Sequence, residues 1–384
     1  MTDLSPLSSA SLPTGVRSRF IDHVNGLRVH VLEAGFEAEG RPPEGRPMLL
    51  LLHGFPEIAY SWRKVIPALA QAGFHVVAPD QRGYGRTTGW DASYDGDLGS
   101  FRLLNLVRDM LGLLAALGRS SVSAVVGHDF GASAAAWCAL ARPDVFRSLV
   151  LMSAPFGGPP ALTPSARPAE DPVHAAMLAL PRPRKHYQWY YSTRPANENM
   201  WHCPQGVHAF LRAYYHHKSA DWAGNKPFRL TSWSATELAK MPTYYIMDAA
   251  LGMAETVAAE MPSEAEIAAC RWLTEAELQV YAGEYARNGF QGGLQWYRSR
   301  TEGIGLGDLQ VFSGRSIDVP SLFIAGRSDW GIYQTPGAIE RMQGTGCSDM
   351  RGVHLIEGAG HWVQQEKADE VNALLLQFLG TMRG

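Results

Sequence analysis

The 384-residue sequence contains little cysteine, little net charge and no long apolar run. Its four cysteines, Cys138, Cys203, Cys270 and Cys347, lie far apart and form no C-x-x-C pair, which argues against a zinc site or a disulfide framework. No apolar stretch approaches the roughly 20 residues that span a bilayer, so no membrane segment is expected. The net charge of −3 and the scattered lysines and arginines give no reason to expect nucleic acid or an anionic membrane as a partner.

The start of the chain also lacks a targeting signal. The segment Met1 to Pro6 has neither the basic start nor the apolar stretch of a secretion signal. Together with reduced cysteines, this is typical of a cytoplasmic protein, which is the location we expect. The apolar fraction of 46% predicts a full core, and the length fits two ordinary domains or one large α/β domain with an insertion.

Short continuous apolar segments alternate with helical patterns over the first 155 residues. Near the start, Asn25-Gly26 between apolar residues is a strong hairpin signal. Continuous apolar strands separated by helices predict a mostly parallel sheet that helices cover on both faces. The expected strands are 47–52, 74–78, 122–126 and 148–152, and the expected helices are 62–72, 103–117 and 132–137.

The α/β pattern breaks after the fourth of these strands. Residues 153–184 are rich in proline and glycine, as in a linker, and 186–299 is aromatic-rich and mainly helical, without β periodicity. Strands return at 319–326 and 353–356, before a closing helix over 371–379. We therefore predict one sheet domain that is interrupted by a helical cap. The predicted parts are a flexible arm over 1–18, the core over 19–155, the linker and cap over 156–305, and the rest of the core over 306–384.

The segment Gly127-His128-Asp129-Phe130-Gly131 joins a predicted strand to a helix of small residues. A strand, a small-x-nucleophile-x-small turn and a helix together form the nucleophile elbow of the α/β-hydrolase fold. The turn is so sharp that its middle residue is strained, and the flanking glycines make room for it. Asp129 is therefore expected to be the nucleophile, the alternative for this residue being an ordinary helix N-cap.

An aspartate at the elbow suits a particular class of substrate. Attack of a serine on an sp³ carbon would leave an ether, which water activated by histidine does not cleave. Attack of a carboxylate leaves an ester, which such water hydrolyses. Asp129 therefore favours epoxides or alkyl halides as substrates and disfavours an ordinary esterase or amidase.

Two further residues follow predicted strands in the order that α/β-hydrolases use. Asp329 directly follows the strand 319–326, and His361 lies on the loop after the next strand. Nucleophile, acid and histidine thus each occur at the carboxyl end of a strand. Taken singly, each is an unremarkable loop residue, but together with the elbow they predict a triad of Asp129, Asp329 and His361.

A loop after the first core strand completes the predicted site. In this fold the loop, here His53 to Glu57, supplies one backbone N–H to an oxyanion hole, and the residue after the nucleophile supplies the other. We assign these two donors to Phe55 and Phe130. His128 and the glycine turn from Asp80 to Gly85 are expected to be structural.

With these motifs the chain resembles the α/β-hydrolase-fold epoxide hydrolases, particularly bacterial enzymes akin to soluble epoxide hydrolase. The match runs from about residue 20 to the C-terminus and includes Gly358 to Trp362 and two cap segments, Tyr187-Gln188 and Gly289 to Arg298. The resemblance implies that Tyr187 and Tyr297 are the two lid tyrosines. Related dehalogenases share the core motifs but not this tyrosine pair.

One residue departs from the family pattern, and the assignment of one lid tyrosine has alternatives. The residue after the nucleophile is often Trp in this family, and Phe130 in its place should alter pocket shape more than mechanism. The first lid tyrosine is assigned to Tyr187 by the Tyr-Gln match, with Tyr190 and Tyr191 as the alternatives.

The resemblance implies an epoxide hydrolase that converts epoxides to vicinal diols through an ester on Asp129, which water activated by His361 hydrolyses. It implies no metal and no organic cofactor. The expected partners are a small hydrophobic epoxide and water, and a homodimer formed through the cap is compatible with the sequence. The aromatic cap suggests a hydrophobic pocket, whose candidate substrate-binding residues are Trp189, Trp296, Phe130 and Trp362.

The sequence leaves two other functions open. A hydrolytic dehalogenase would use the same triad, but an enzyme of the fluoroacetate type needs cations beside the nucleophile, and Phe130, Ala132 and Ser133 follow Asp129. An enzyme of the haloalkane type commonly donates to halide from a neighbouring Trp, and a Phe ring has no N–H. A non-catalytic binding protein on the same scaffold would be expected to lose part of the triad.

Overall fold

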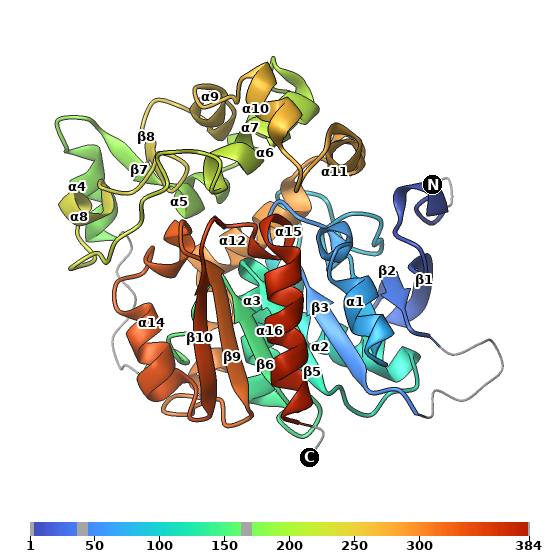
Figure 1. The fold of residues 1–384 in the computed structure, drawn as a ribbon. Helices are drawn as coiled ribbons and strands as arrows, with labels where there is room; N and C mark the ends of the chain where they lie inside the picture. Colours follow the sequence, from blue (N-terminus) through green and yellow to red (C-terminus); the bar gives the residue numbers. More distant parts are fainter. Residues whose placement is uncertain (1–3, 37–44, 163–170, 383–384) are drawn as a thin grey trace.

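The structure, a computed structural model, describes residues 4–36, 45–162 and 171–382. An eight-stranded sheet forms its centre, and a cap of mainly helical segments lies above the carboxyl ends of the parallel strands (Figure 1). The strand order is β1-β2-β4-β3-β5-β6-β9-β10, parallel from β4 to β10. The strands are β1 Arg17–Val24, β2 Leu27–Ala34, β3 Met48–Leu52, β4 His75–Pro79, β5 Ala124–His128, β6 Leu149–Met152, β9 Ser321–Gly326 and β10 Met350–Ile356.

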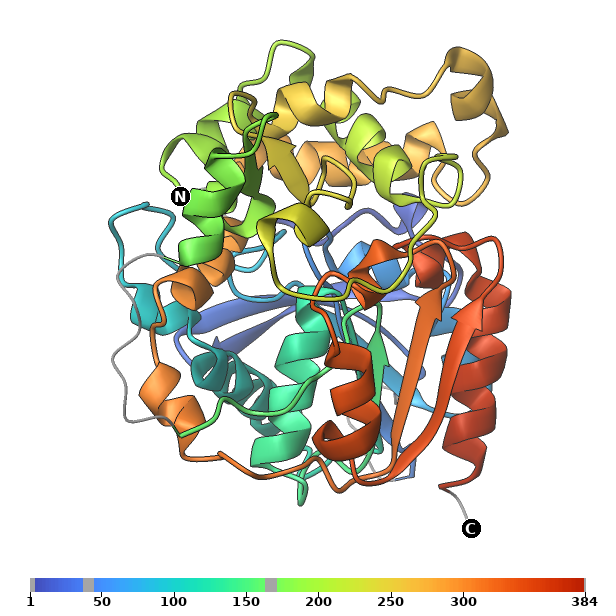
Figure 2. The same ribbon diagram turned by 90° about the vertical axis from the view of Figure 1, so that its left-hand side faces the viewer.

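Helices cover both faces of this sheet. The helices α1 (Ile66–Gln71) and α16 (Ala368–Gly380) contact each other on one face, and α2 (Leu103–Ala116) and α3 (Phe130–Ala141) contact each other on the opposite face (Figure 2). Every residue of β3, β4, β5 and β6 is buried, because strands covered on both faces have no solvent side and so read as continuous apolar runs. The predicted α/β-hydrolase architecture, with its mostly parallel sheet, is confirmed. Shorter core helices are α13 Leu306–Gln310, α14 Ala338–Arg341 and α15 Val363–Glu366.

The predicted hairpin joins β1 to β2. Val24 pairs with Leu27, and the two turn residues have positive φ angles, 49° at Asn25 and 81° at Gly26, as a type I′ turn requires. The strand β1 begins at Arg17, within the range 1–18 that the sequence analysis predicted as an N-terminal arm. The described part of the arm is tied to the core by a hydrogen bond of 2.8 Å from the Leu7 N–H to Ser18 Oγ.

The helix predicted over 62–72 is wrong over its first four residues, 62–65. Ala59–Trp62 forms a 3₁₀ turn, η2, and α1 begins only at Ile66. Pro67 explains the late start, since proline has no N–H to donate and is favoured in the first turn of a helix but not in its interior.

The cap is helical except for a small sheet that the sequence did not reveal. The strands β7 (Arg184–His186) and β8 (Ile246–Asp248) pair antiparallel, and three residues each are too few to show a β periodicity. The cap helices are α4 Pro172–Leu178, α5 Tyr187–Tyr191, α6 Pro195–Trp201, α7 Gly206–Lys218, α8 Ala235–Leu238, α9 Met253–Ala258, α10 Glu264–Ala269 and α11 Glu275–Asn288.

The helix α12 (Gln291–Thr301) fastens the cap to the core. A Cβ atom at Gly292 would lie 2.0 Å from the carbonyl oxygen of Gly83, so the two backbones meet where neither residue carries a side chain. In the same contact, Trp296 Nε1 donates to the carbonyl oxygen of Arg82 at 2.9 Å. The glycine turn from Asp80 to Gly85 thus forms a packing surface for α12, in agreement with its expected structural role.

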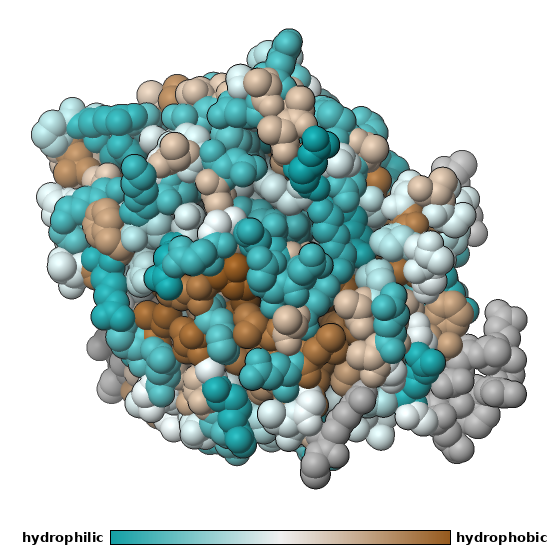
Figure 3. All heavy atoms as spheres, in the orientation of Figure 1, coloured by the Kyte–Doolittle hydropathy of each residue, from teal (hydrophilic) through white to brown (hydrophobic). Residues whose placement is uncertain are grey.

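The surface is mostly polar over the cap, and apolar residues gather below it, over the part of the molecule where Figure 1 draws β9 and β10 (Figure 3). Among the described residues, none of the helices has the length and apolar character needed to cross a membrane. The four cysteines are all free thiols.

Candidate active site

Asp129 stands at the turn between β5 and α3 with φ 52° and ψ −122°. This conformation is strained for a residue with a side chain, as expected at a nucleophile elbow. The glycines on either side permit it, because a Cβ at Gly127 would lie 2.2 Å from the carbonyl oxygen of Gly131, and a Cβ at Gly131 would lie 2.3 Å from that of Leu52. The sequence therefore folds here into an elbow that raises one carboxylate above the sheet.

The Asp129 carboxylate is 7% exposed and meets the loop after β3. The backbone N–H of Phe55 donates to its Oδ1 at 3.0 Å, which is the geometry expected of an oxyanion-hole donor. The loop approaches so closely that a Cβ at Gly54 would lie 2.4 Å from Asp129 Cβ. The second predicted donor, the Phe130 N–H, is the first of α3 and bonds to nothing else in the described part of the chain, so it is available for the same oxygen.

His361 and Asp329 lie on the loops after β10 and β9, beside Asp129. His361 Nδ1 donates to Asp329 Oδ1 at 3.1 Å, and the Gly331 N–H donates to the same oxygen at 2.7 Å. His361 Nε2 lies 3.3 Å from Asp129 Oδ2 and has no hydrogen-bond partner of good geometry among the described residues. The structure thus brings the three predicted triad residues together, with the imidazole fixed by one carboxylate and directed at the other.

Both triad carboxylates are held in their charged form. Burial raises the pKa of Asp129, but the closeness and charge of His361, followed by the charges of Lys218 and His128, lower it by more. Burial also raises the pKa of Asp329. The charge and hydrogen bond of His361 and the Gly331 N–H outweigh this effect, so the pKa lies below its ordinary value. An ionised Asp129 is what a nucleophile at this position requires.

His128, inside the elbow, is part of a buried ion pair that supports the triad. Its Nδ1 lies 2.6 Å from Glu57 Oε2, and its Nε2 donates to the carbonyl oxygen of His361 at 2.7 Å. Glu57 also accepts hydrogen bonds from the Gly54 N–H and from the side chains of Gln364 and Gln365. The pair therefore joins the loop after β3, the elbow and the His361 loop, a structural role as expected for His128.

The two predicted lid tyrosines come from α5 and α12 and meet over this site. The ring centroids of Tyr187 and Tyr297 are 5.8 Å apart, and the Tyr297 ring packs edge-on against Phe55 and Phe130. Burial, followed by the charge of Asp129, raises the pKa of both phenols, so both are protonated hydrogen-bond donors at neutral pH. The Tyr187 hydroxyl donates to Gln334 Oε1 at 3.3 Å and accepts from Gln188 Nε2 at 3.1 Å.

The alternatives to Tyr187 have their hydroxyl groups engaged elsewhere. The Tyr191 hydroxyl donates to the Tyr214 hydroxyl at 3.1 Å. Tyr190 packs its ring under Lys185, whose Nζ is 4.5 Å from the ring centroid, and its hydroxyl bonds to the backbone at Met253. This arrangement favours Tyr187 as the partner of Tyr297.

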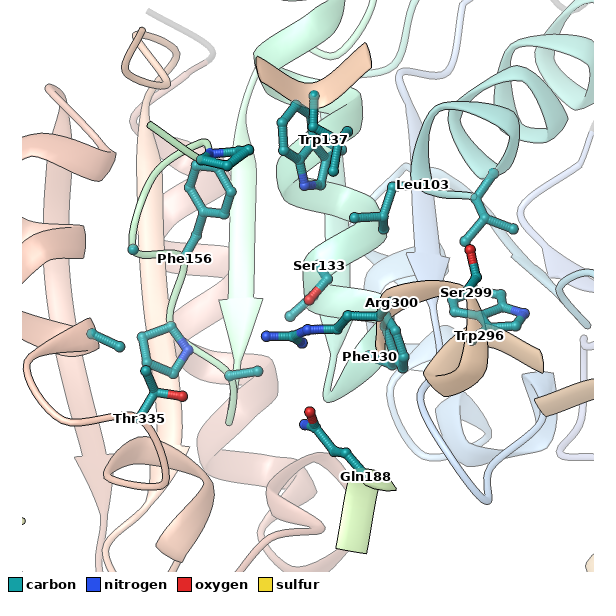
Figure 4. Close-up of a pocket in the computed structure, with 18 of the residues that line it drawn as sticks. Leu103, Phe130, Ser133, Trp137, Phe156, Gln188, Trp296, Ser299, Arg300 and Thr335 are labelled. Atoms are coloured by element: carbon teal, nitrogen blue, oxygen red, sulfur yellow. The ribbon is translucent and has the colours of Figure 1, made fainter. Parts of the chain in front are cut away.

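A cavity of about 370 Å³ is lined in part by Phe130, the residue that follows Asp129 (Figure 4). Asp129 does not line it, but Gln188 and Gln334 do, and these two are the hydrogen-bond partners of the Tyr187 hydroxyl. Its walls are largely apolar side chains: Phe101, Leu103, Leu106, Phe130, Trp137, Phe156, Trp296, Ile304, Leu306 and Leu309.

Of the four substrate-binding candidates, Phe130 and Trp296 line this cavity, and the other two do not. The Trp189 ring is turned toward His174, with ring centroids 4.4 Å apart, because successive residues of a short helix point in different directions. Trp362 is fully buried beneath His361, and its Nε1 donates to the carbonyl oxygen of Tyr215 at 2.8 Å. We therefore leave Trp189 and Trp362 out of the binding site.

Known proteins resemble this chain over nearly its whole length. The family model for the alpha/beta hydrolase fold matches residues 47–368. Epoxide hydrolase B of Mycobacterium tuberculosis is 34% identical over 364 residues, which cover 93% of this chain and 97% of that protein. Epoxide hydrolase A of the same organism is 34% identical over 363 residues, which cover 94% of this chain and 96% of that protein.

Solved structures agree. An epoxide hydrolase from an endophytic Streptomyces superposes with a TM-score of 0.76 at 31% identity, and 97% of each chain is covered. Potato (Solanum tuberosum) epoxide hydrolase I superposes with a TM-score of 0.71 at 28% identity, covering 95% of this chain and 99% of that one. The chain belongs to the epoxide hydrolases of the α/β-hydrolase fold.

One residue of this epoxide hydrolase was missed by the sequence analysis, which looked for cations only among the residues that directly follow Asp129. Lys218, the last residue of α7, is 3% exposed, and its charge acts on Asp129. The sequence signal was weak, because a lysine after His216-His217 looks like an ordinary solvated helix end. Only the folding of the cap over the sheet brings it to the site.

Another residue that the sequence analysis missed is Arg300. It is the only charged residue among the described residues that line the cavity, and its guanidinium points into the cavity between Ser133 and Gln188 (Figure 4). The described residues contain no cluster of three or more histidine, cysteine or acidic side chains arranged to hold a metal ion.

Proposed function

We propose that this epoxide hydrolase opens its substrate in two steps, through a covalent ester on Asp129. The observation that carries the proposal is a carboxylate at the nucleophile elbow with an imidazole Nε2 3.3 Å from its Oδ2. A carboxylate that attacks carbon forms an ester, and an imidazole at this place can direct water at that ester. The triad, the two lid tyrosines and the two backbone donors take the following roles.

In the first step, a carboxylate oxygen of Asp129 attacks an epoxide carbon and the ring C–O bond breaks. Tyr187 and Tyr297 hydrogen-bond the ring oxygen, and one of them gives it a proton, leaving a hydroxyalkyl ester and a tyrosinate. The hydrogen bond from Tyr187 to Gln334 is 3.3 Å long, at the weak end of the range, so an epoxide oxygen can replace Gln334 as the acceptor.

In the second step, His361 takes a proton from water while the water oxygen attacks the ester carbonyl. The N–H groups of Phe55 and Phe130 stabilise the oxyanion, and one such donor typically contributes about 3–4 kcal/mol. The tetrahedral intermediate expels the diol oxygen, which receives the proton from His361. The carboxylic acid left on Asp129 then loses its proton, and the tyrosinate regains one, which restores the free enzyme.

The cavity supports an epoxide with an apolar body as the substrate. Its apolar wall includes Phe130, the residue after Asp129, and Trp296, whose ring packs edge-on against Phe130, so the body of the substrate would occupy the cavity while the epoxide ring reaches Asp129. The homodimer considered from the sequence stays a prediction.

A panel of terminal, aryl and internal epoxides tests the proposal, with diol measured by mass spectrometry. Wild type should form diol, and Asp129→Ala should form neither diol nor adduct. His361→Ala should accumulate an ester on the Asp129 peptide. Asp144→Ala serves as a control, because that aspartate is exposed and pairs with Arg142 away from the site.

Isotope labelling separates this route from direct attack by water on the epoxide. In a single turnover in ¹⁸O-water, the label should appear in Asp129 and not in the diol, since the water oxygen attacks the ester carbonyl. Label in the diol alone would contradict the ester. Release of free halide from haloacids, with no diol from any epoxide, would instead indicate the dehalogenase.

A further inference from the structure

Lys218 lies in the interior, next to the catalytic loop. Its carbonyl oxygen accepts a hydrogen bond of 2.9 Å from the His361 N–H, so its backbone and the catalytic histidine are neighbours. Its Nζ is surrounded by four rings: Tyr245 at 4.9 Å, Trp362 at 5.3 Å, Tyr214 at 5.5 Å and Tyr244 at 5.8 Å from the ring centroids. The ammonium therefore has cation–π contacts on several sides.

This buried cation has no direct ionic partner. Among the described residues, its Nζ forms no ion pair with a carboxylate within 4.0 Å, and its close contacts are those with the four rings. Burial lowers the pKa of Lys218 below its ordinary value, and the charges of Asp129, Asp329 and Glu57 offset only part of that effect. A buried charge without an ion-pair partner is costly, so a buried lysine whose charge acts on Asp129 calls for a reason.

We propose that Lys218 is a positioning residue that keeps negative charge on Asp129 and thereby sets the balance between the two steps of the reaction. The inference rests on the proposed ester. Asp129 is negative in the free enzyme, neutral in the ester, and carries negative charge again in the oxyanion of the second step. A fixed cation nearby stabilises the first and third of these states but not the ester.

Two consequences follow from this electrostatic difference. Lys218 slows formation of the ester, because charge leaves Asp129 in that step, and it speeds hydrolysis, because charge returns. While Asp129 carries the ester, it does not react with another substrate molecule. Lys218 therefore keeps the fraction of enzyme in the ester form low. Since Lys218 and Asp129 are not in direct contact, the carboxylate oxygen facing His361 stays open for attack on the substrate.

The experiment compares wild type with K218M and K218R, using styrene oxide as an uncharged probe. Rapid acid quench followed by intact-mass analysis gives the rates of ester formation and decay. We expect K218M to form the ester several-fold faster and to hydrolyse it about tenfold more slowly, so that the ester accumulates in the steady state. K218R, which keeps the charge, should restore a low level of ester.

A matched control removes the same charge elsewhere. Lys240 is half exposed and pairs with Glu237, so K240M should leave both rates as in wild type. K218M should be at least as stable as wild type in thermal unfolding, because an apolar side chain of similar size suits a cage of aromatic rings. If K218M does not fold, K218Q provides the neutral variant.

Either of two results would overturn the role of Lys218. The first is that K218M forms and hydrolyses the ester at the same rates as wild type. The second is that K218M and K218R both lose ester formation and ester hydrolysis to the same extent, as a purely structural role predicts. Failure of the proposed function looks different, because wild type and His361→Ala would then give no ester at all.

Discussion

His128 donates a hydrogen bond from Nε2 to the backbone carbonyl oxygen of His361, 2.7 Å away. Its other nitrogen, Nδ1, donates to Glu57 at 2.6 Å, so both ring nitrogens carry a proton and the ring is an imidazolium. Burial lowers the pKa of His128, but the charge and hydrogen bond of Glu57, together with the charge of Asp129 and the carbonyl of His361, raise it above its ordinary value. His128, the residue before Asp129, thus holds the backbone of His361 in place by means of a buried ion pair.

Removing one member of this pair should destabilise the protein strongly. E57Q leaves the buried His128 without its counter-charge, and we expect a loss of about 3–5 kcal/mol in the free energy of unfolding, measured with guanidinium chloride. E357Q is the control, because Glu357 is largely exposed and its pair with Arg327 should contribute less than about 1 kcal/mol. A loss in E57Q no larger than that in E357Q would contradict the structural role.

The contribution of this pair should also depend on pH. Burial raises the pKa of Glu57, but His128 and other donors bring it down to about 2, so this part of the stability is lost as pH falls from about 4.5 toward 2. The pKa of His128 is raised, so its part is complete below about pH 6.5 and is lost as pH rises through the folded-state value. The stability difference between wild type and E57Q should therefore be largest near pH 5–6 and smaller on both sides. A difference that grows steadily with pH would contradict this.

The lid tyrosines should act in the first step only. Y187F and Y297F should each slow ester formation, and the double variant should lose about 10²–10⁴-fold, since both donors to the ring oxygen are gone. Ester hydrolysis should change little. Y190F is the matched control, because that hydroxyl bonds to the backbone away from the site. Wild-type rates in the double variant would remove both tyrosines from the mechanism.

Ester formation should show no loss at alkaline pH. Burial and the charge of Asp129 raise the pKa of Tyr187 and Tyr297 above the ordinary value of 10.0, so both phenols keep their protons. The single-turnover rate should therefore be flat between about pH 7 and pH 10, as measured by rapid quench. A decrease within this range that disappears in Y187F or Y297F would mean that a lid phenol ionises there.

Arg300 should favour substrates that carry a carboxylate at the end of an apolar chain. Because its guanidinium is exposed at the cavity, we expect an effect of about 1 kcal/mol, or roughly fivefold in KM, between an epoxy acid and its methyl ester. R300M should abolish this preference without changing kcat for the ester. R315M removes the same charge from an exposed position and should keep the preference. An equal preference in wild type and R300M would exclude this role.

Much of the site was predictable because it depends on local sequence at strand ends. Asp129, Asp329 and His361 each follow a buried strand, and the carboxyl ends of parallel strands meet at one edge of a sheet. The elbow needs only a strand, two small residues and a helix, all of which are short-range features. The late start of α1 at Ile66 and the three-residue strands β7 and β8 show where local patterns were too short or were overruled by proline.

Local sequence patterns were therefore enough to predict the fold class, the place of Asp129 at the elbow, and the grouping of Asp329 and His361 with it. Tertiary structure alone decided which cap side chains face the site. Three residues from distant parts of the chain contribute to the site or to its cavity: Lys218, Gln334 and Arg300. Two other residues do not line the cavity, although their neighbours in the sequence belong to the predicted site: Trp189 and Trp362. The physical reason is that the direction of a side chain on a short cap helix depends on how that helix packs on the sheet, which no local pattern encodes.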